Sequence, residues 1–405
     1  MDLMAEGVAR GMVLKTALTH KLTIDGQTLA YPVYRIRIDQ LHYNPQNDRI
    51  ATWMSQYREE HDGQMPDASN LEAYNTIVES FIVASNPDAI KQTANNIRLY
   101  DQRVPGIVLS NGLIIDGNRR FTCLRRLARD DPKFTWIEMV ILPESIAADP
   151  KRIKILELAI QHGEEGKVDY NPVDRLVGVY NDVLKSRLLT PEEYARSTNT
   201  PVVEVNKMMR EARLMVDFLG FANAQGKFHL ARELAVSGPI KEIPAILKNC
   251  ADEDEEEVVK NCIFANMLVE PKGDITRYVR RFKGVLKSPA AKDFIAEEAD
   301  IAADVVDKLA SVEEVTVSTI REEIRGDTAL ANRFNDALER ADSKAKGARL
   351  MAAPVENLQS ALELMERVDV MTLAKLPQED VDRAIKAIGG IERLAEEIRG
   401  AVAEA

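Results

Sequence analysis

The chain of 405 residues contains few of the residues that identify the best-known classes of protein. Three cysteines (Cys123, Cys250 and Cys262) stand far apart and are odd in number. They predict reduced thiols and exclude both a disulfide framework and a cysteine-rich zinc motif. The five histidines are dispersed without metal-ligand spacing. The sequence also has no nucleophile elbow and no Walker loop.

Long hydrophobic runs and an excess of positive charge are missing as well. No apolar run is long enough to cross a membrane, and the opening MDLMAEG lacks a basic n-region, so we expect a cytoplasmic protein without a signal peptide. The net charge is −12, which argues against broad nucleic-acid binding by the whole chain. Local basic patches can still bind phosphates. The two densest patches contain Arg119, Arg120, Arg125, Arg126 and Arg129, and Arg277, Arg280, Arg281 and Lys283.

The length and the hydrophobic patterning predict two or three domains. Strand-like runs are concentrated before residue 150, and helical spacing dominates after it. We expect an α+β domain over residues 1–150, a helical helix-turn-helix region over 151–220, and a helical C-terminal domain over 221–405. The last of these would serve oligomerisation or partner binding.

The most informative stretch runs from Asn111 to Arg129, with the text NGLIIDGNRRFTCLRRLAR. Asn111-Gly112 lies between two apolar runs, which predicts a β-hairpin with a type I′ turn. The returning strand ends at Asp116-Gly117, and helical spacing follows. The free N–H groups at this helix start, beside Arg119 and Arg120, predict an anion site suited to phosphate. The alternative is an ordinary exposed basic helix.

Other elements follow from turn and capping signals. We expect a hairpin about Asp25-Gly26, a helix over 70–98, and a strand over 134–141 that packs beside the central hairpin. Asn171-Pro172 and Thr190-Pro191 are typical helix starts, the second with a capping box to Glu193. The helix after Pro201 is expected over residues 202–218. Helix, short turn and helix at this length indicate helix-turn-helix geometry.

The C-terminal helices are expected to be divided at Pro354, at Pro377 and at Gly389-Gly390. Apolar stripes follow helical spacing on both sides of Pro377, and such stripes bury against neighbouring helices or a second subunit. The stripe residues are Val355, Leu358, Leu362 and Met365, then Val381, Ile385 and Ile388.

Four segments in a fixed order resemble the ParB/sulfiredoxin superfamily over roughly residues 30–220. The box Gly117-Asn118-Arg119-Arg120 is similar to the family's arginine box, which follows a strand and opens a helix. The other three segments are Tyr34–Pro45, residues 156–174 (LELAI and DYNPVD) and Leu189–Ala195 (LTPEEYA).

The sequence departs from the family pattern at several positions. Asn118 stands where ParB proteins have Glu and where sulfiredoxins have their reactive Cys, so sulfiredoxin chemistry is not expected. In the third box, Glu164 and Lys167 stand in for the usual ligands, although this text (HGEEGK) also suits a polar turn. Met65–Asn70 looks like an insertion.

The resemblance implies a nucleotide-dependent DNA-binding protein of clamp, partition or regulatory type, with CTP or another nucleoside triphosphate and Mg²⁺ as cofactors. By this resemblance, Gly117, Asn118, Arg119, Arg120 and Lys167 would hold the triphosphate. Glu164 would hold Mg²⁺. The protein would form a homodimer and would act with duplex DNA and a partner ATPase or operon protein. Any hydrolysis would be slow, because no strong general base is visible, and no catalytic residue is assigned.

DNA contacts are predicted for Asn206, Lys207, Arg210 and Arg213 on the second helix of the helix-turn-helix. Residues 190–219 hold one more acid than base, so a purely structural helix pair is the alternative. Two further functions stay open. One is an enzyme of the same superfamily, either a nuclease or a small-molecule kinase with Asp116 as base. The other is a protein-binding scaffold from a mobile-element or phage-defence operon.

Overall fold

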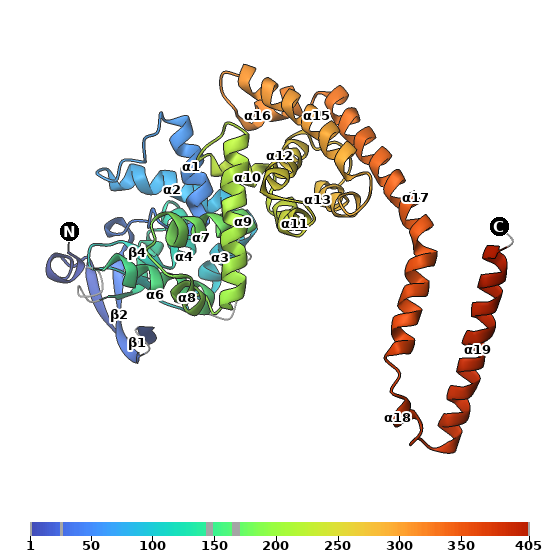
Figure 1. The fold of residues 1–405 in the computed structure, drawn as a ribbon. Helices are drawn as coiled ribbons and strands as arrows, with labels where there is room; N and C mark the ends of the chain where they lie inside the picture. The colour runs from blue at the N-terminus through green and yellow to red at the C-terminus, as the bar shows by residue number, and fades with distance from the viewer. Residues whose placement is uncertain (1, 25–26, 143–148, 164–170, 404–405) are drawn as a thin grey trace.

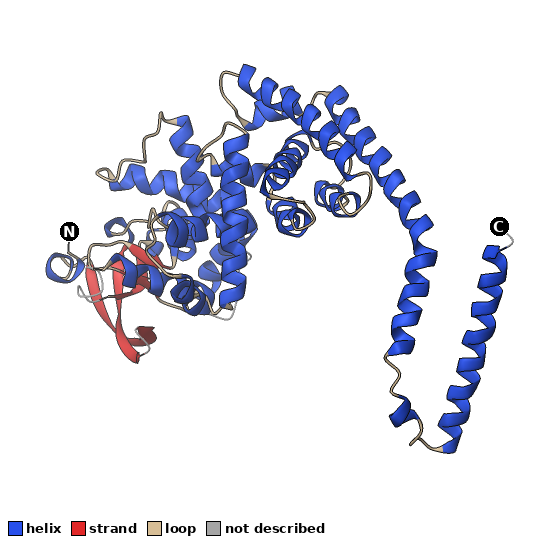
Figure 2. Ribbon diagram, viewed as in Figure 1, coloured by secondary structure: helices blue, strands red, loops and turns tan. Residues whose placement is uncertain are grey.

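The structure is a computed structural model that describes residues 2–24, 27–142, 149–163 and 171–403 (Figure 1). A five-stranded sheet lies in the N-terminal part, and almost everything after it is helical (Figure 2). This is the α+β and then α-helical layout that the sequence predicts. Among the described residues, no helix is both long and apolar enough to span a membrane.

The sheet is mixed, with the strand order β1-β2-β5-β3-β4. Neighbouring strands are antiparallel except for β3 and β5, which are parallel. The predicted strand over 134–141 therefore does lie beside the central hairpin. The strands are β1 (Val13–Ile24), β2 (Gln27–Arg37), β3 (Gly106–Val108), β4 (Ile114–Asp116) and β5 (Trp136–Ile141). Asp25 and Gly26 lie outside the described residues, but Ile24 pairs with Gln27 as a hairpin requires.

The turn between β3 and β4 is a hairpin turn of another type than predicted. Gly112 has a φ of +90°, whereas Asn111 is not among the residues with positive φ, so the turn is not type I′. Asn111 instead accepts a hydrogen bond from the Leu113 N–H at 3.0 Å through its side chain. A Cβ on Gly112 would lie 2.5 Å from the carbonyl oxygen of Gln40, so close backbone packing also requires glycine here.

Four helices pack with the sheet in the N-terminal part. The helix predicted over 70–98 is two helices, because Asn86 caps the second and Pro87 occupies its first turn. Tyr43, Ile36 and Phe121 are fully buried in the core that these elements share. The helices are α1 (Ala51–Glu60), α2 (Leu71–Ser85), α3 (Pro87–Tyr100) and α4 (Asn118–Ala128).

The next helices confirm the capping signals of the sequence. Asn171 caps its helix by accepting from the Val173 N–H, and Thr190 and Glu193 form the predicted capping box. The helix after Pro201 is three residues longer than predicted. These helices are α6 (Pro150–Gly163), α7 (Pro172–Val179), α8 (Pro191–Ser197) and α9 (Val202–Phe221).

A single hydrophobic core extends from Leu158 in α6 to Ala341 in α17. It includes Phe218, Phe264 and Phe334 from three separate helices. The helices that follow α9 are α10 (Phe228–Glu233), α11 (Ser237–Leu247), α12 (Glu253–Val269), α13 (Ile275–Arg280), α14 (Phe282–Val285), α15 (Ala291–Ser311), α16 (Val317–Thr319) and α17 (Thr328–Glu366). The domain boundaries at residues 150 and 220 stay predictions.

The C-terminal segment corrects two predicted helix breaks. Pro354 lies inside α17, and Gly389-Gly390 lie inside the last helix, α19 (Gln378–Ala403), which follows the short α18 (Val370–Leu373). Pro354 removes one donor but does not end the helix, because the flanking residues are good helix formers. Pro377 does precede α19, as expected. Figure 1 shows the outer part of α17 leading away from the body and α19 running back.

A buried ionic cluster links the N-terminal part to the helical part. The ammonium of Lys154 lies 2.9 Å from Asp48 Oδ1, 3.6 Å from Glu157 Oε2 and 3.3 Å from Asp182 Oδ2. Burial opposes the charge of Lys154, but the three carboxylates together raise its pKa well above the ordinary value. Burial, with the nearby charge of Asp48, raises the pKa of Asp182 to about 7.

Asp182→Asn should change how stability depends on pH. In the unfolded chain Asp182 ionises near its ordinary pKa of 3.8, whereas in the folded chain it keeps its proton until about pH 7. Ionisation therefore reduces the free energy of unfolding of the wild type as the pH rises from 4 to 7. The variant lacks this pH-dependent decrease. The difference in free energy of unfolding, variant minus wild type, should therefore become more positive by up to about 2–4 kcal/mol across that window.

Urea titrations of both proteins at pH 4.5, 6.0 and 7.5 measure this difference. Because Asp174, whose pKa burial raises to about 6, titrates in both proteins, only the difference between them reports on Asp182. A difference that does not change with pH would contradict the prediction.

Candidate phosphate-binding site

The start of α4 presents free backbone donors, as the sequence predicts. Gly117 leaves β4 in the left-handed region with a φ of +100°, and its carbonyl accepts the first helical bond, from Phe121 N at 2.8 Å. No side-chain cap bonds this helix start. The N–H groups of the first turn and the positive end of the helix dipole thus lie next to Asn118 and Arg119.

A small cavity opens beside this helix start. Its volume is about 30 Å³, so side chains would have to move apart before a phosphate could enter. Segments that are distant in the sequence come together here: the loop before α1, the end of α2 and the start of α4. The lining residues are Asn47, Arg49, Ile82, Ser85, Asn86, Asn118 and Arg119.

Two guanidinium groups share this half-buried place. Burial lowers the pKa of Arg119, and the like charge of Arg49 lowers it further. Within the described ranges, no carboxylate lies within ion-pair distance of Arg119. Like charges that are gathered away from water lower their energy when an anion binds between them. Arg49, two residues after Asn47, was not predicted, because the family-like segment ends at Pro45.

Two buried polar atoms at the same helix start lack hydrogen-bond partners among the residues that the structure describes. They are Asn118 Oδ1 and Arg120 Nε. Arg120 also forms an ion pair with Asp116, in which Nη2 lies 2.6 Å from Oδ2. The amide of Asn118 could equally present its NH₂ group, since the two ends of an amide are interchangeable. Unsatisfied buried groups are rare in folded proteins, so these two atoms have hydrogen-bonding capacity that a polar ligand could use.

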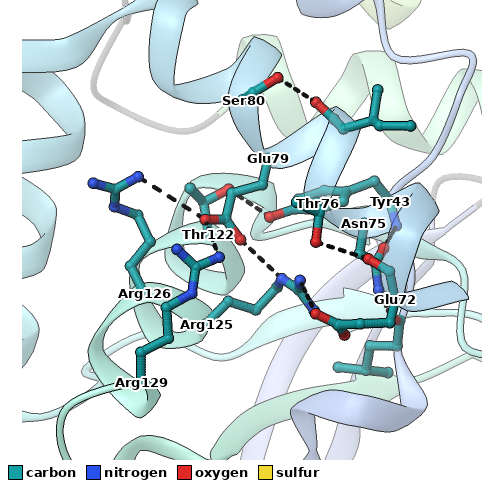
Figure 3. Close-up of polar contacts among 12 residues, drawn as sticks. Tyr43, Glu72, Asn75, Thr76, Glu79, Ser80, Thr122, Arg125, Arg126 and Arg129 are labelled. Carbon is teal, nitrogen blue, oxygen red and sulfur yellow. Dashed lines mark hydrogen bonds and ion pairs between the residues drawn. The ribbon is translucent and has the colours of Figure 1, made fainter.

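The other three arginines of the basic patch are engaged by α2 (Figure 3). Arg125, which is buried, contacts Glu79 from Nε at 3.0 Å and Glu72 from Nη2 at 2.9 Å. Arg129 Nη2 lies 2.9 Å from Glu79, and Arg126 Nη1 lies 3.9 Å from it. The patch is therefore divided: Arg119 and Arg120 face the helix start, while the other three hold α4 against α2.

Two of the four basic residues of the second patch are paired in the same way. Arg280 pairs with Glu242 at 2.6 Å, and Arg281 pairs with Glu339 and Asp342 at 3.0 Å each. These pairs join α11, the α13–α14 region and α17. These pairs offset part of the positive charge that the patch could offer to a nucleic acid.

Lys167 and Glu164 fall outside the described residues, so their predicted roles in phosphate and Mg²⁺ binding stay predictions. No cluster of histidine, cysteine and acidic side chains suited to a metal ion occurs in the part of the chain that the structure describes. Asn44, in the family-like segment, is buried and accepts from the Gln46 N–H at 3.0 Å.

A larger pocket, which the sequence did not predict, has Asn44 in its wall. Its volume is about 470 Å³. The segment interpreted as an insertion supplies Met65, Pro66 and Ala68 to its wall, and the buried Lys154 and Glu157 also line it. No motif marks this pocket, because its residues come from five separate stretches of the chain.

The helix-turn-helix prediction places its four candidate residues on α9, which follows α8 after a short turn. Asn206, Lys207, Arg210 and Arg213 are all exposed, whereas Val205, Met208 and Ala212 on the opposite side are buried. Lys207 also contacts Glu204 at 3.5 Å, a weak surface pair. The four side chains therefore share one accessible face.

Glu79→Ala should destabilise the fold by about 3–5 kcal/mol, because it leaves the buried Arg125 without its inner partner. Glu72→Ala is the matched control: it removes a glutamate from the same helix that contacts the same arginine, but Glu72 is 73% exposed on its side chain against 4% for Glu79. The control should cost less than about 1 kcal/mol. Denaturant unfolding followed by circular dichroism measures both values, and equal destabilisation by the two substitutions would contradict the structural role of Glu79.

No protein-family model matches the chain, and no curated protein matches it in sequence. The membership of the ParB/sulfiredoxin superfamily therefore stays a prediction that rests on the segments quoted above.

Proposed function

We propose that this protein binds a nucleoside triphosphate at the start of α4 and that nucleotide binding controls its association with duplex DNA. The observation that carries the proposal is the gathering at this helix start of polar groups whose charge or hydrogen-bonding capacity is not fully used. Arg119 lacks a carboxylate partner among the described residues, and Asn118 Oδ1 and Arg120 Nε lack hydrogen bonds there. The resemblance to the ParB/sulfiredoxin superfamily selects CTP with Mg²⁺ as the first ligand to test.

The chemistry of the site suits a polyphosphate. Backbone N–H groups at a helix start bind phosphate oxygens, and arginine adds bidentate, charge-assisted hydrogen bonds. Arg49 and Arg119 approach from two different elements, so they could bind different oxygens of the chain of phosphates. Lys167 and Glu164 are proposed to complete the site, the first at a phosphate and the second at Mg²⁺.

Duplex DNA is the proposed macromolecular partner, and the exposed face of α9 is the proposed contact. Asn206, Lys207, Arg210 and Arg213 offer the hydrogen-bond donors that phosphates and base edges accept. The proposed assembly is a homodimer with a partner ATPase or another operon protein.

The kinase alternative has less support than the DNA-binding proposal. It requires Asp116 as a general base, but the Asp116 carboxylate is already engaged by Arg120 at 2.6 Å. A base in this position would first have to leave its ion pair. The scaffold alternative assigns no ligand to the start of α4. It therefore does not explain the unpartnered polar atoms at that position.

Arg119→Ala should weaken nucleotide binding about 10- to 100-fold, the effect of removing a charge-assisted hydrogen bond to phosphate. The matched control is Arg126→Ala, which removes the same residue type from the same helix but outside the cavity. Calorimetric titration with CTP, ATP, GTP and UTP plus Mg²⁺ measures the affinities. Equal affinity in wild type and Arg119→Ala, both folded, would contradict the phosphate site. Failure of the wild type to bind any nucleotide would remove the proposal.

Lys207→Ala with Arg210→Ala should weaken DNA binding and should reduce the slope of log affinity against log salt by about 2, because two phosphates are no longer neutralised. Lys287→Ala with Lys292→Ala removes two exposed lysines elsewhere and serves as the control. Fluorescence anisotropy with a labelled duplex at several salt concentrations, with and without CTP, gives both quantities. An unchanged slope in the first variant would exclude α9 as the DNA-binding face.

A further inference from the structure

A glutamate lies in the core of the helical body with no cation beside it. Glu298, on α15, is fully buried. Among the described residues, no lysine, arginine or histidine lies within ion-pair distance of it, and the nearby Glu297 has the same charge. A lone carboxylate away from water costs so much free energy that such a group keeps its proton instead. Burial accordingly raises the pKa of Glu298 well above its ordinary value.

The side chain that contacts Glu298 is Asn266 on α12, which is also fully buried. Asn266 Nδ2 donates to the carbonyl oxygen of Cys262 at 2.9 Å and to Glu298 Oε2 at 2.6 Å. Exchange of the two ends of the amide would place Oδ1 against the carbonyl oxygen of Cys262, where neither atom can donate. The two hydrogen bonds therefore fix the direction of the amide.

Each of these two side chains keeps one oxygen without a hydrogen bond among the described residues. They are Glu298 Oε1 and Asn266 Oδ1, and both are buried. Two acceptors cannot bond to each other, but a protonated carboxyl group has an O–H to donate. A proton on Oε1 would satisfy both oxygens with one bond. Because buried oxygens without partners are rare, this pair of them indicates one and the same proton.

The position of the pair gives it a role in the packing of the helical body. The helix α15 packs against α12 and against α17. Its contact with α17 includes three ion pairs between exposed side chains. They are Asp293 with Lys344, Glu297 with Arg340, and Asp304 with Arg333. Its contact with α12, by contrast, contains the buried pair of Glu298 and Asn266.

We propose that Glu298 and Asn266 form a reciprocal acid–amide pair, in which Glu298 Oε1–H donates to Asn266 Oδ1, and that this pair is a proton-dependent latch between α15 and α12. With the proton in place, two hydrogen bonds join the helices. When the proton leaves, Oε1 and Oδ1 repel each other and an uncompensated charge remains in the core, so α15 opens from α12. This inference does not rest on the nucleotide or DNA proposals.

The other groups around Glu298 do not compete with it for this role. Burial, and then the nearby Glu298, raises the pKa of Cys262 on α12 and of Tyr278 on α13, so both groups keep their protons. The basic side chains of α17 that contact α15 are those of its three ion pairs. The segment Ile320–Ile324 also contacts α15, and its charged residues are exposed.

Glu298→Gln tests the proton through stability. Glutamine has the same shape, cannot ionise and still offers an N–H to Asn266 Oδ1. In the unfolded chain Glu298 ionises near its ordinary pKa of 4.5, whereas the folded chain keeps the proton. The folding equilibrium constant of the wild type should therefore fall relative to that of the variant by about tenfold per pH unit above about pH 5, until Glu298 ionises in the folded chain.

Urea titrations at pH 5.0, 6.5 and 8.0 measure this ratio. The matched control is Glu297→Gln, which changes the neighbouring glutamate, 42% exposed on its side chain and paired with Arg340. Its ratio to the wild type should stay within about tenfold across the same range. A ratio of wild type to Glu298→Gln that does not change with pH would overturn the proposal.

Infrared spectroscopy tests the proton and the reciprocal bond without relying on that variant. The wild type should still show the carbonyl band of a protonated carboxyl group at pH 8.0, above the pKa values of about 6 and about 7 of Asp174 and Asp182. Asn266→Leu removes the acceptor of the O–H, so the band should move to higher frequency. Absence of the band from the wild type, or an unchanged frequency in folded Asn266→Leu, would overturn the acid–amide pair.

Alkylation by iodoacetamide, followed by peptide mass spectrometry, tests the latch. Cys262 is buried on α12 and should react only when α12 separates from α15. The rate in the wild type divided by that in Glu298→Gln should rise with pH by up to about tenfold per unit, since the reactivity of the thiol itself cancels. Cys123, buried in the N-terminal part, is the internal control, and its ratio should stay constant. A constant ratio at Cys262, or an equal rise at Cys123, would exclude a local latch.

Discussion

The buried ammonium of Lys154 is the interaction on which the arrangement of the two parts of this protein depends. It holds Asp48 from the N-terminal part, Glu157 from its own helix, and Asp182 from the π-helical segment that continues α7. Gly178 packs so closely on Asp48 that a Cβ would lie 2.7 Å from its carboxylate. Removing one partner of a buried ion pair leaves the other charge buried without compensation, which is strongly destabilising. The cluster fixes the position of α6 and α7 relative to the loop that supplies Asn47 and Arg49 to the cavity.

The helix α4 illustrates how one residue type takes two roles within a short segment. All five arginines of residues 119–129 look alike in the sequence. The acids of α2 decide between them, because Glu79 and Glu72 lie along one side of α4 and engage Arg125, Arg126 and Arg129. The same helix α2 ends at the cavity with Ser85. The helix that neutralises three arginines of the patch thus also helps to form the cavity beside Arg119.

Local signals were the most predictable part of this chain. The caps at Asn171 and Thr190, the central hairpin and the start of α4 follow from short-range chemistry that any context preserves. Helix breaks were harder to predict. Pro87, after the cap Asn86, separates α2 from α3, whereas Pro354 lies inside α17 and only removes a hydrogen bond. The members of the cavity could not be predicted as a set. Arg49 and Asn86 reach Arg119 only through tertiary packing, and nothing local in the sequence marks that meeting.

The hydrogen bonds between the N-terminal part and the helical part also bear on the order in which the chain can fold. Thr52 donates to Asp174, Lys227 donates to Glu59, and Arg232 donates to Thr52, which join residues 122, 168 and 180 positions apart. Such interactions form late, since the loop must close before they contribute. During synthesis, α1 therefore emerges long before its partners in α7 and α10 exist. A fragment that ends near residue 150 would expose the buried face of α1 and the carboxylate of Asp48, so the N-terminal part matures only after the chain has been made as far as Arg232.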